Sequence, residues 1–364
     1  MSPRVRFRSV RIPRLLRLVE GSDAAADALG EIAQPASGTV LAVHSGAASG
    51  SHYAVRFLAA ARQRGHIIEE CVVDGHTMSS VDAVRRRISD GSPSLVVGIG
   101  GGHVVDVAKL AAARSKADFL SVPTQASSDG LCSPVAVIIS TAGRPRSIGA
   151  KIPAGVIVDM EVLRSAPLQT WRSGLGDLIS NVSAVRDWRD AHQQRGEQID
   201  DFACLTSEAA ALSVIAADAS VSNPVYQEKL VRGLILSGIA MEMAGSSRPS
   251  SGSEHLVSHA LDSLLEEPQL HGLQVALATI AMTILRGEDV GWLVDFYRRV
   301  GLPVVPADLG ISTAVFLDAI RIGPSTRPGR TTLLDEIGAD DIARLEAELE
   351  AGPARRATLS SALA

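Results

Sequence analysis

The sequence predicts an α/β domain built on a Rossmann-like parallel sheet, followed by an all-α domain, with a cleft between the two. The chain has 364 residues, whereas one hydrophobic core usually organises only roughly 250–300 residues. Short β-rich runs alternate with helical runs over the first part of the chain, and long amphipathic segments without β-rich runs follow. We therefore expect one domain over residues 1–165 and a second over residues 166–364.

The alternation of strands and helices in the first domain predicts a parallel sheet with helices on both faces. The Arg-rich beginning of the chain, where Arg alternates with Val, Phe and Ile, is expected to form a first strand. The later strands are expected at 39–46, 66–75, 94–102, 118–124, 134–140 and 154–160, with helices at 51–65, 81–91 and 103–116. Because parallel crossovers are right-handed, the loops after the strands should gather at one edge of the sheet.

Ala-, Leu- and Ser-rich amphipathic segments predict the helices of the second domain. These segments span 173–195, 204–220, 226–247, 253–267, 271–287 and 291–299. Residues 246–252 are expected to be a loop. Residues 322–333, which are rich in Pro, Gly and Arg, are expected to connect to a final helix.

The composition argues against several classes of protein. A net charge of −5 is atypical of a nucleic-acid-binding surface, which is normally basic. The three cysteines include no CxxC pair, so neither a disulfide framework nor a thiolate zinc site is indicated, and a reducing cytoplasm is expected. Charged residues interrupt the longest apolar stretches, so no membrane span is expected, and the N-terminus lacks the apolar core of a signal peptide.

Three histidines lie close together in the sequence. If the segment around His255 is helical, His255 and His259 share one face of the helix. His271 precedes the next helical run, so the start of that helix could bring it back toward the pair. Asp177 is the candidate carboxylate. Two imidazoles and a carboxylate suit zinc, with iron or nickel also possible, and an open coordination position would be typical of a catalytic site. The alternative is that these histidines are hydrogen-bonded residues of a helix surface or core.

Consecutive glycines separate a predicted strand from a predicted helix. Gly100, Gly101 and Gly102 would allow the backbone to approach a ligand closely, and the helix N-terminus behind them would attract a phosphate. Tight strand–helix packing is the alternative explanation. Asp106 and Lys109 on the following helix are expected to pair with each other or with other loops rather than contact a ligand.

The segment 121–134, SVPTQASSDGLCSP, is the hydroxyl-rich loop that follows a predicted strand. Its hydroxyl groups could hydrogen-bond a pyrophosphate or a ribose, and Asp129 adds an anionic group. A solvated turn is the alternative, since Ser, Asp and Gly are common in turns. Its expected position at the carboxyl edge of the sheet, beside the glycines, favours a binding role. The hydroxyl-bearing residues are Ser121, Thr124, Ser127, Ser128 and Ser133.

Taken together, these strings resemble the glycerol-1-phosphate dehydrogenase family, within the larger group of dehydroquinate-synthase-like and metal-dependent alcohol dehydrogenases. The resemblance runs from residue 11 to residue 338. The dehydroquinate synthase branch fits less well, because its typical Lys- and Asn-bearing sequences are absent. The matching strings are GGGHVVDVAK, SVPTQASSDGLCSP, GLGDLISNVSAVRDW, SGSEHLVSHALD and HGLQVALATI.

The resemblance implies a role for each of these residues. Asp177, His255 and His271 would bind the metal, most often zinc. His259 and Asp129 would act in catalysis and contact the substrate, and Asp177 would contact both metal and substrate. The pyrophosphate of NAD or NADP would be held by Gly100, Gly101, Gly102, His103, Val104, Thr124, Ser127 and Ser133.

The reaction that the resemblance implies is reversible hydride transfer between NAD(P)H and dihydroxyacetone phosphate, giving sn-glycerol 1-phosphate. A divalent ion with an open position would polarise the ketone as a Lewis acid, and the nicotinamide would carry the hydride. The alternatives are a reductase of another phosphorylated or cyclic ketone, a sugar-phosphate cyclase that retains NAD, and a non-catalytic descendant. A homo-oligomer is also expected.

The end of the strand expected at 39–46 departs from the pattern of related alcohol dehydrogenases. Those relatives often carry an acidic residue there, where it can bind a ribose hydroxyl. This chain has His44 and Ser45 instead, which leaves NADP(H) as open as NAD(H).

Overall fold

The computed structural model describes residues 10–46, 52–141, 143–217 and 220–353. Its main sheet has six parallel strands in the order β1-β8-β5-β4-β2-β3, which confirms the expected fold class. The Arg-rich stretch expected as a first strand lies largely outside the described residues. The strands are β1 (Leu15–Val19), β2 (Val40–His44), β3 (Ile68–Val72), β4 (Leu95–Gly100), β5 (Phe119–Pro123) and β8 (Gly155–Asp159).

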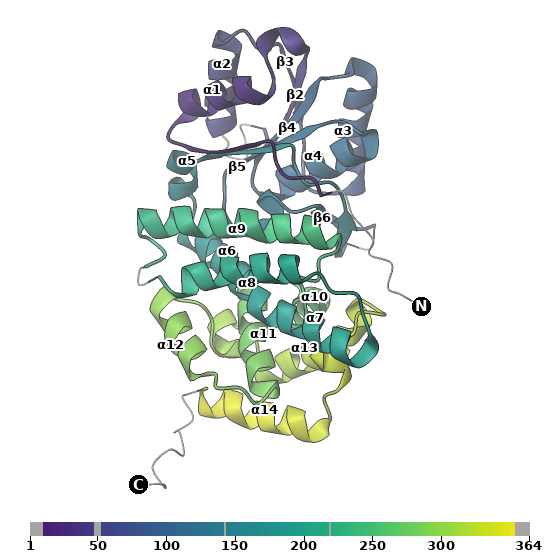
Figure 1. Cartoon of the computed structure of the whole chain (residues 1–364), viewed down its shortest axis with the longest axis vertical. Helices are drawn as coiled ribbons and strands as arrows, with labels where there is room; N and C mark the ends of the chain where they lie inside the picture. Colours follow the sequence, from purple (N-terminus) through teal and green to yellow (C-terminus); the bar gives the residue numbers. More distant parts are fainter. Residues whose placement is uncertain (1–9, 47–51, 142, 218–219, 354–364) are drawn as a thin grey trace.

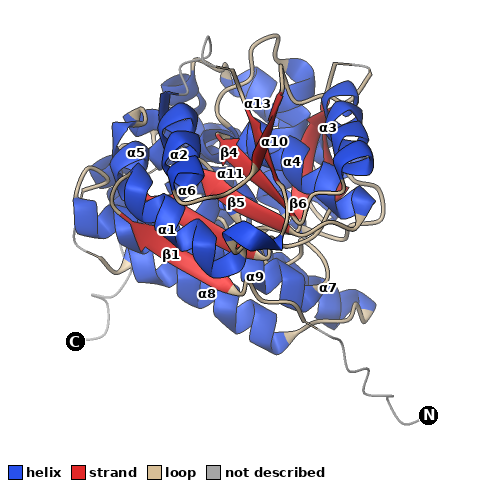
Figure 2. Cartoon of the chain, turned by 90° about the horizontal axis from the view of Figure 1, so that it is seen from above, coloured by secondary structure: helices blue, strands red, loops and turns tan. Residues whose placement is uncertain are grey.

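Helices cover both faces of this sheet because successive strand residues point to opposite sides. Val97 and Ile99 pack with α1 and α2, whereas Leu41 and Val96 pack with α3 and α4. Figure 2 shows the strands between these helices. The continuous burial of β2, β4, β5 and β8 explains why their sequences are mostly apolar and do not alternate with polar residues. The helices are α1 (Ser22–Ile32), α2 (His52–Gln63), α3 (Met78–Gly91), α4 (Gly102–Ser115) and α5 (Met160–Ser165).

One expected strand lies outside the main sheet. Residues of the 134–140 run form β6 (Val135–Ile139), which pairs antiparallel with β7 (Pro145–Gly149) in a separate two-stranded sheet. The placement of this run in the parallel sheet was therefore wrong. Only one side of β6 is buried against α4, since Ala136 and Ile138 are buried and Val137 is exposed. Such alternation is typical of an antiparallel hairpin and not of a central parallel strand.

The rest of the chain is helical and lies on one side of the sheet domain (Figure 1). The predicted segment 173–195 is two helices that meet at Ser180. The predicted connection over 322–333 was wrong at its beginning, because α13 continues to Thr326. Pro324 is tolerated in its last turn, where a missing N–H costs little. The helices are α6 (Leu168–Ile179), α7 (Asn181–Arg195), α8 (Asp201–Ile215), α9 (Pro224–Ala244), α10 (Ser253–Leu264), α11 (His271–Leu285), α12 (Gly291–Val300), α13 (Thr313–Thr326) and α14 (Ala339–Ala351).

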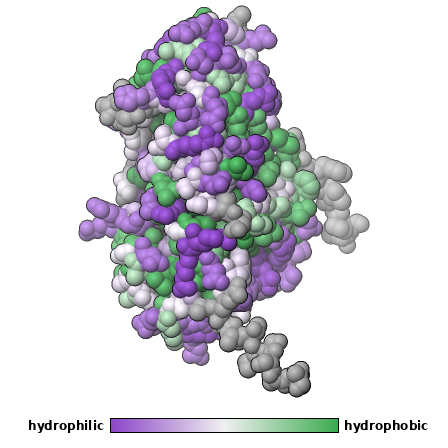
Figure 3. Space-filling model, turned by 90° about the vertical axis from the view of Figure 1, so that its left-hand side faces the viewer, coloured by the Kyte–Doolittle hydropathy of each residue, from purple (hydrophilic) through white to green (hydrophobic). Residues whose placement is uncertain are grey.

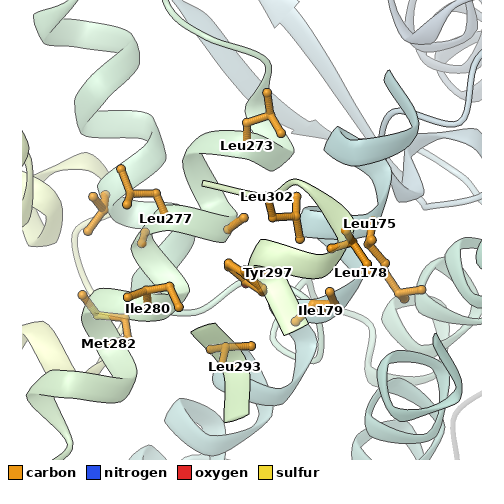
Figure 4. Packing of buried hydrophobic residues seen from close by; sticks show 14 of the residues in the cluster. Leu175, Leu178, Ile179, Leu273, Leu277, Ile280, Met282, Leu293, Tyr297 and Leu302 are labelled. Atoms are coloured by element: carbon orange, nitrogen blue, oxygen red, sulfur yellow. The ribbon is translucent and has the colours of Figure 1, made fainter. Parts of the chain in front are cut away.

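No helix within the described ranges is long and apolar enough to cross a membrane. On the side shown in Figure 3, hydrophilic residues cover much of the surface, and apolar residues are interspersed among them. The large apolar side chains of the helical part are mostly in its core. Figure 4 shows α6, α11 and α12 packed through Leu178, Ile280 and Tyr297, all of which are buried.

Two glycines bring α6 and α11 into backbone contact. A Cβ atom added to Gly272 would lie 1.8 Å from the carbonyl oxygen of Ser173, and one added to Gly176 would lie 2.2 Å from the carbonyl oxygen of Gly272. Only glycine fits such a close approach. The residues next to these glycines, Asp177 and His271, therefore lie at the contact between the two helices.

We predict that Gly272→Ala lowers the free energy of unfolding by at least ~1–3 kcal/mol, the range for an overpacked core. The added methyl group must push α11 away from the α6 backbone. Chemical denaturation of the variant and the parent protein would measure this. Gly149→Ala is the control, because a Cβ atom there meets nothing within 4 Å. Equal stability of the Gly272 and Gly149 variants would contradict the account.

Candidate active site

Three helices each supply one potential metal ligand. Asp177 lies near the end of α6, His255 lies in the first turn of α10, and His271 is the first residue of α11. The Nε2 atoms of His255 and His271 lie 3.5 and 3.6 Å from Oδ1 of Asp177. One ligand atom from each residue lies within 4.8 Å of the other two. The structure thus brings together the carboxylate and the two imidazoles that were far apart in the sequence.

The spacing of these atoms fits a small divalent ion. Ligand atoms bound at ~2.0–2.2 Å in a tetrahedral zinc site are about 3.4 Å from each other. The two observed separations between Asp177 and the histidine nitrogens, 3.5 and 3.6 Å, are close to that value. With three protein ligands, a tetrahedral ion keeps its fourth position open for another molecule, as catalytic zinc sites do.

Hydrogen bonds to the other ring nitrogens orient both imidazoles. Nδ1 of His255 lies 2.9 Å from Oε1 of Glu254, and this oxygen also accepts the backbone N–H of Gly252 at 2.6 Å. Nδ1 of His271 lies 3.1 Å from the hydroxyl of Ser258. These contacts turn the Nε2 atoms toward Asp177, an arrangement that commonly supports metal-binding histidines. Sequence reasoning missed Glu254 and Ser258, although both lie within the SGSEHLVSH string.

The electrostatics of the cluster favour a charged His255 and an ionised Asp177 in the absence of a metal. Burial opposes the charge on His255, but the hydrogen bonds that its ring donates to Asp177 and Glu254 outweigh it and raise the pKa of His255 to about 9. Burial likewise opposes the charge on Asp177, but His255 and His271 lower its pKa overall. Opposite charges on His255 and Asp177 therefore hold the cluster together. A metal cation could take over the role of the positive charge on His255.

The two predicted substrate residues lie beside this cluster. His259 is on the face of α10 that carries His255, and its ring centroid lies 6.3 Å from that of His271. The backbone N–H of Asp129 donates to Oδ2 of Asp177 at 2.9 Å, and its carboxylate accepts the hydroxyl of Ser237 at 2.9 Å. The hydroxyl-rich loop is thereby bound directly to Asp177.

Burial changes the pKa of both predicted substrate residues. It lowers the pKa of His259 to about 3, with help from the positive charges of His271, His255, Arg327 and Arg330. Burial and the neighbouring Asp177 raise the pKa of Asp129 to about 7. At neutral pH His259 is therefore a neutral imidazole, and Asp129 is protonated part of the time.

The glycines lie at the junction of β4 and α4, as predicted. Gly101 is the N-cap of α4, and a Cβ atom on Gly100 would lie 2.9 Å from the Cβ of Val104. The N–H of Thr124 donates to the carbonyl oxygen of Gly100 at 2.9 Å. The beginning of the hydroxyl-rich loop and the glycine turn are therefore adjacent, and Ser127 follows Thr124 on this partly exposed loop.

Two other predicted cofactor residues have different surroundings. The side chain of Ser133 is buried, and its hydroxyl lies 3.4 Å from the carbonyl oxygen of Val135. His103 is exposed at the start of α4 and stacks on His76 with ring centroids 3.6 Å apart. Neither side chain has a described contact with the glycine turn or with the metal-ligand cluster.

Lys109 is buried and joins α4, the helix after the glycine turn, to the hydroxyl-rich loop. Its ammonium group donates to Asp106 at 2.9 Å, which confirms the predicted pairing. It also donates to the carbonyl oxygens of Gly130 at 2.7 Å and Val135 at 2.6 Å. This set of bonds fixes the backbone next to Asp129, so Lys109 positions the loop rather than the ligand.

A carboxylate reaches the end of β2 from a neighbouring strand. Nε2 of the buried His44 lies 3.0 Å from the carboxylate of Glu70, which also pairs with Arg62. Glu70 of β3 is thus held between His44 and Arg62.

Solved structures with the same fold are oxidoreductases with low sequence identity to this chain. A probable glycerol dehydrogenase from Sinorhizobium meliloti aligns with a TM-score of 0.74 at 22% identity, covering 95% of this chain and 99% of that one. A sulfoacetaldehyde reductase from Bifidobacterium kashiwanohense, solved in complex with NAD+, aligns with a TM-score of 0.67 at 18% identity, covering 96% of this chain and 100% of that one. At these identities the similarity establishes the fold alone.

Sequence comparison gives closer relatives. The iron-containing alcohol dehydrogenase family model matches residues 22–167. A glycerol-1-phosphate dehydrogenase [NAD(P)+] from Pyrococcus furiosus is 40% identical over 284 residues, which are 77% of this chain and 81% of that protein. The enzyme of the same name from Methanothermobacter thermautotrophicus is 41% identical over 278 residues, 75% of this chain and 79% of that protein. The chain therefore belongs to the glycerol-1-phosphate dehydrogenase family.

Proposed function

We propose that this protein catalyses the reversible, NAD(P)H-dependent reduction of dihydroxyacetone phosphate to sn-glycerol 1-phosphate. The observation that carries the proposal is the convergence of Asp177, His255 and His271 beside the hydroxyl-rich loop. Relatives about 40% identical are named glycerol-1-phosphate dehydrogenases, which supports the same reaction. Both domains contribute, because the loop belongs to the sheet part of the chain and the ligands belong to its helices.

In this proposal the glycine turn and the adjacent loop hold the cofactor, either NAD or NADP. The N-terminus of α4 would offer its backbone N–H groups to the pyrophosphate. The absence of side chains at the turn lets the phosphates approach the backbone. The residues assigned to this role are Gly100, Gly101, Gly102, His103, Val104, Thr124, Ser127 and Ser133.

Asp177, His255 and His271 would hold a divalent ion. Zinc fits the ligand set best, and iron or nickel is compatible with it. When bound, the ion supplies a Lewis acid that polarises the ketone oxygen. Glu254 and Ser258 keep the two imidazoles turned toward that position.

His259 and Asp129 are assigned to the substrate. Ketone reduction consumes a proton, which must reach the former carbonyl oxygen. A neutral imidazole carries one N–H and one lone pair, so His259 can donate a proton from one nitrogen while accepting another. Asp129, whose pKa of about 7 allows both protonation states, can hydrogen-bond a substrate hydroxyl as donor or acceptor.

The proposal also covers the cellular compartment and the oligomeric state. A reducing cytoplasm is supported by the cysteines, since Cys71, Cys132 and Cys204 are free thiols and two of them are buried. A homo-oligomer is supported by Phe202, Leu205 and Leu212, whose side chains lie exposed along one side of α8.

The reaction is tested by following absorbance loss of NADPH and NADH with dihydroxyacetone phosphate and zinc-loaded protein. We expect oxidation of at least one cofactor, loss of turnover after EDTA treatment, and its return with zinc. Chiral analysis of the product should give sn-glycerol 1-phosphate. Tightly retained NAD without net oxidation of added NADH would contradict the proposal and indicate a cyclase.

Replacement of one ligand tests the metal site. His271→Ala removes one of three protein ligands, so we expect zinc content after dialysis and turnover to fall together. His52→Ala is the control, because His52 is exposed on α2, away from the metal-ligand cluster. Full zinc retention and turnover in the His271 variant would show that the ion binds elsewhere.

Glu254 is predicted to set metal affinity without binding the ion. Glu254→Ala leaves Nδ1 of His255 without its partner, and such losses typically weaken metal binding by ~10–100-fold. A competition titration with a chelating dye would measure the affinity. Glu254→Gln, which can still accept a hydrogen bond from Nδ1, should recover part of it. An affinity unchanged in Glu254→Ala would refute the positioning role.

A further inference from the structure

Two arginines converge on one serine near the proposed substrate site. Nη1 of Arg327 donates to the hydroxyl oxygen of Ser247 at 2.9 Å, and Nη2 of Arg330 donates to the same oxygen at 3.1 Å. Arg330 also donates to the carbonyl oxygen of Ser251. Within the described part of the chain, each of these contacts is to a neutral acceptor.

A third arginine in this group has a direct carboxylate partner, and the pair does not. Arg248 is buried, and its guanidinium makes two hydrogen bonds to the carboxylate of Glu197. Among the described residues, by contrast, no carboxylate lies within ion-pair distance of Arg327 or Arg330. The arginine pair, defined as Arg327 and Arg330, therefore has no direct carboxylate partner among the described residues, and the charges of Glu197 and Glu254 act on Arg330 only from beyond ion-pair distance.

Holding this charge without an anion is unfavourable. Burial and the neighbouring guanidinium groups lower the pKa of Arg330 to about 9, and they lower the pKa of Arg327 as well. Partly buried charges are normally paired, because desolvation is costly. Both side chains remain partly accessible, so an anion from solution could provide the missing partner. A guanidinium matches the oxygens of a phosphate group with two parallel hydrogen bonds.

The pair lies against the segment that leads into α10, the helix that carries His255 and His259. Ser247 precedes α10 and the two arginines follow α13, and these two helices pack against each other (Figure 2). The hydrogen bond from Arg330 to the carbonyl oxygen of Ser251 ends two residues before the first residue of α10, so the pair is tied to the start of the helix that carries His259.

We propose that Arg327 and Arg330, with Ser247, bind the phosphate group of the substrate and select phosphorylated over unphosphorylated ketones. This inference rests on the proposed function for the identity of the ketone. The 2′-phosphate of NADP is a second source of the same chemical group. The position of the pair favours the substrate, because it lies beside the metal-binding helix α10, whereas the glycine turn lies on the sheet domain.

Steady-state kinetics with dihydroxyacetone phosphate and with unphosphorylated dihydroxyacetone test whether the pair selects phosphorylated ketones. We expect Arg327→Gln and Arg330→Gln to raise KM for dihydroxyacetone phosphate by ~10-fold or more, the effect of losing a charge-assisted hydrogen bond. Activity with unphosphorylated dihydroxyacetone should stay the same. Arg327→Lys, which keeps the charge, should recover part of the loss. Arg321→Gln is the control, because Arg321 is exposed on the same helix and pairs with Asp318.

Two kinetic outcomes would overturn the assignment of the arginine pair to the substrate phosphate. Equal losses with both ketones would show a structural role for the pair, and a raised KM for NADPH but not NADH would assign the pair to the cofactor. Both outcomes contradict the inference.

Inorganic phosphate provides a test that does not depend on turnover. Thermal shifts with phosphate, measured on zinc-loaded and EDTA-treated full-length protein, should be smaller in both Gln variants than in the parent and in Arg321→Gln. If the parent fails to reduce dihydroxyacetone phosphate but keeps this arginine-dependent shift, the proposed reaction is wrong and the phosphate site stands. Unchanged shifts in both Gln variants would overturn the site itself.

Discussion

The candidate active site depends on the backbone contact between α6 and α11. Gly176 and Gly272 remove the side chains that would keep these helices apart, and Asp177 and His271 follow or precede them directly. A wider separation would move a carboxylate away from an imidazole nitrogen that now lies 3.6 Å from it. The geometry of the ligand cluster is therefore set by helix packing, and the ligands themselves need no unusual backbone conformation.

A buried carboxylate on α7 joins α10, the helix that carries His255, to the segment that carries the arginine pair. Asp187 accepts the N–H of Ser253 at the start of α10 at 2.5 Å and the N–H of Leu333 at 3.1 Å, and it pairs with Arg286 at the end of α11. Burial would make a lone carboxylate here costly, but these partners satisfy it. One residue thus fixes the start of the helix that carries His255 and the backbone shortly after Arg330.

Sequence patterns predicted the parts of this structure that depend on local composition. The sequence alone shows the apolar run of β4, the glycines after it and the helical spacing of His255 and His259. Two features could not be predicted in this way. The hairpin partner β7 has no alternation of apolar residues, and Pro324 made the last turn of α13 look like a loop. The roles of Glu254 and the arginine pair were also missed, because they depend on contacts with Gly252 and Ser247 that only the folded loops create. The meeting of Arg327 with Ser247 joins positions 80 residues apart, and no short pattern records it.

The central claim is that Asp177, His255 and His271 share one metal ion. Anomalous diffraction from crystals of the zinc-loaded protein, collected on both sides of the zinc absorption edge, tests this most directly. The account predicts an anomalous peak ~2.0–2.2 Å from a carboxylate oxygen of Asp177 and from Nε2 of both histidines. A peak bound to other residues, or a zinc-loaded crystal in which these Nε2 atoms carry no metal, would contradict it.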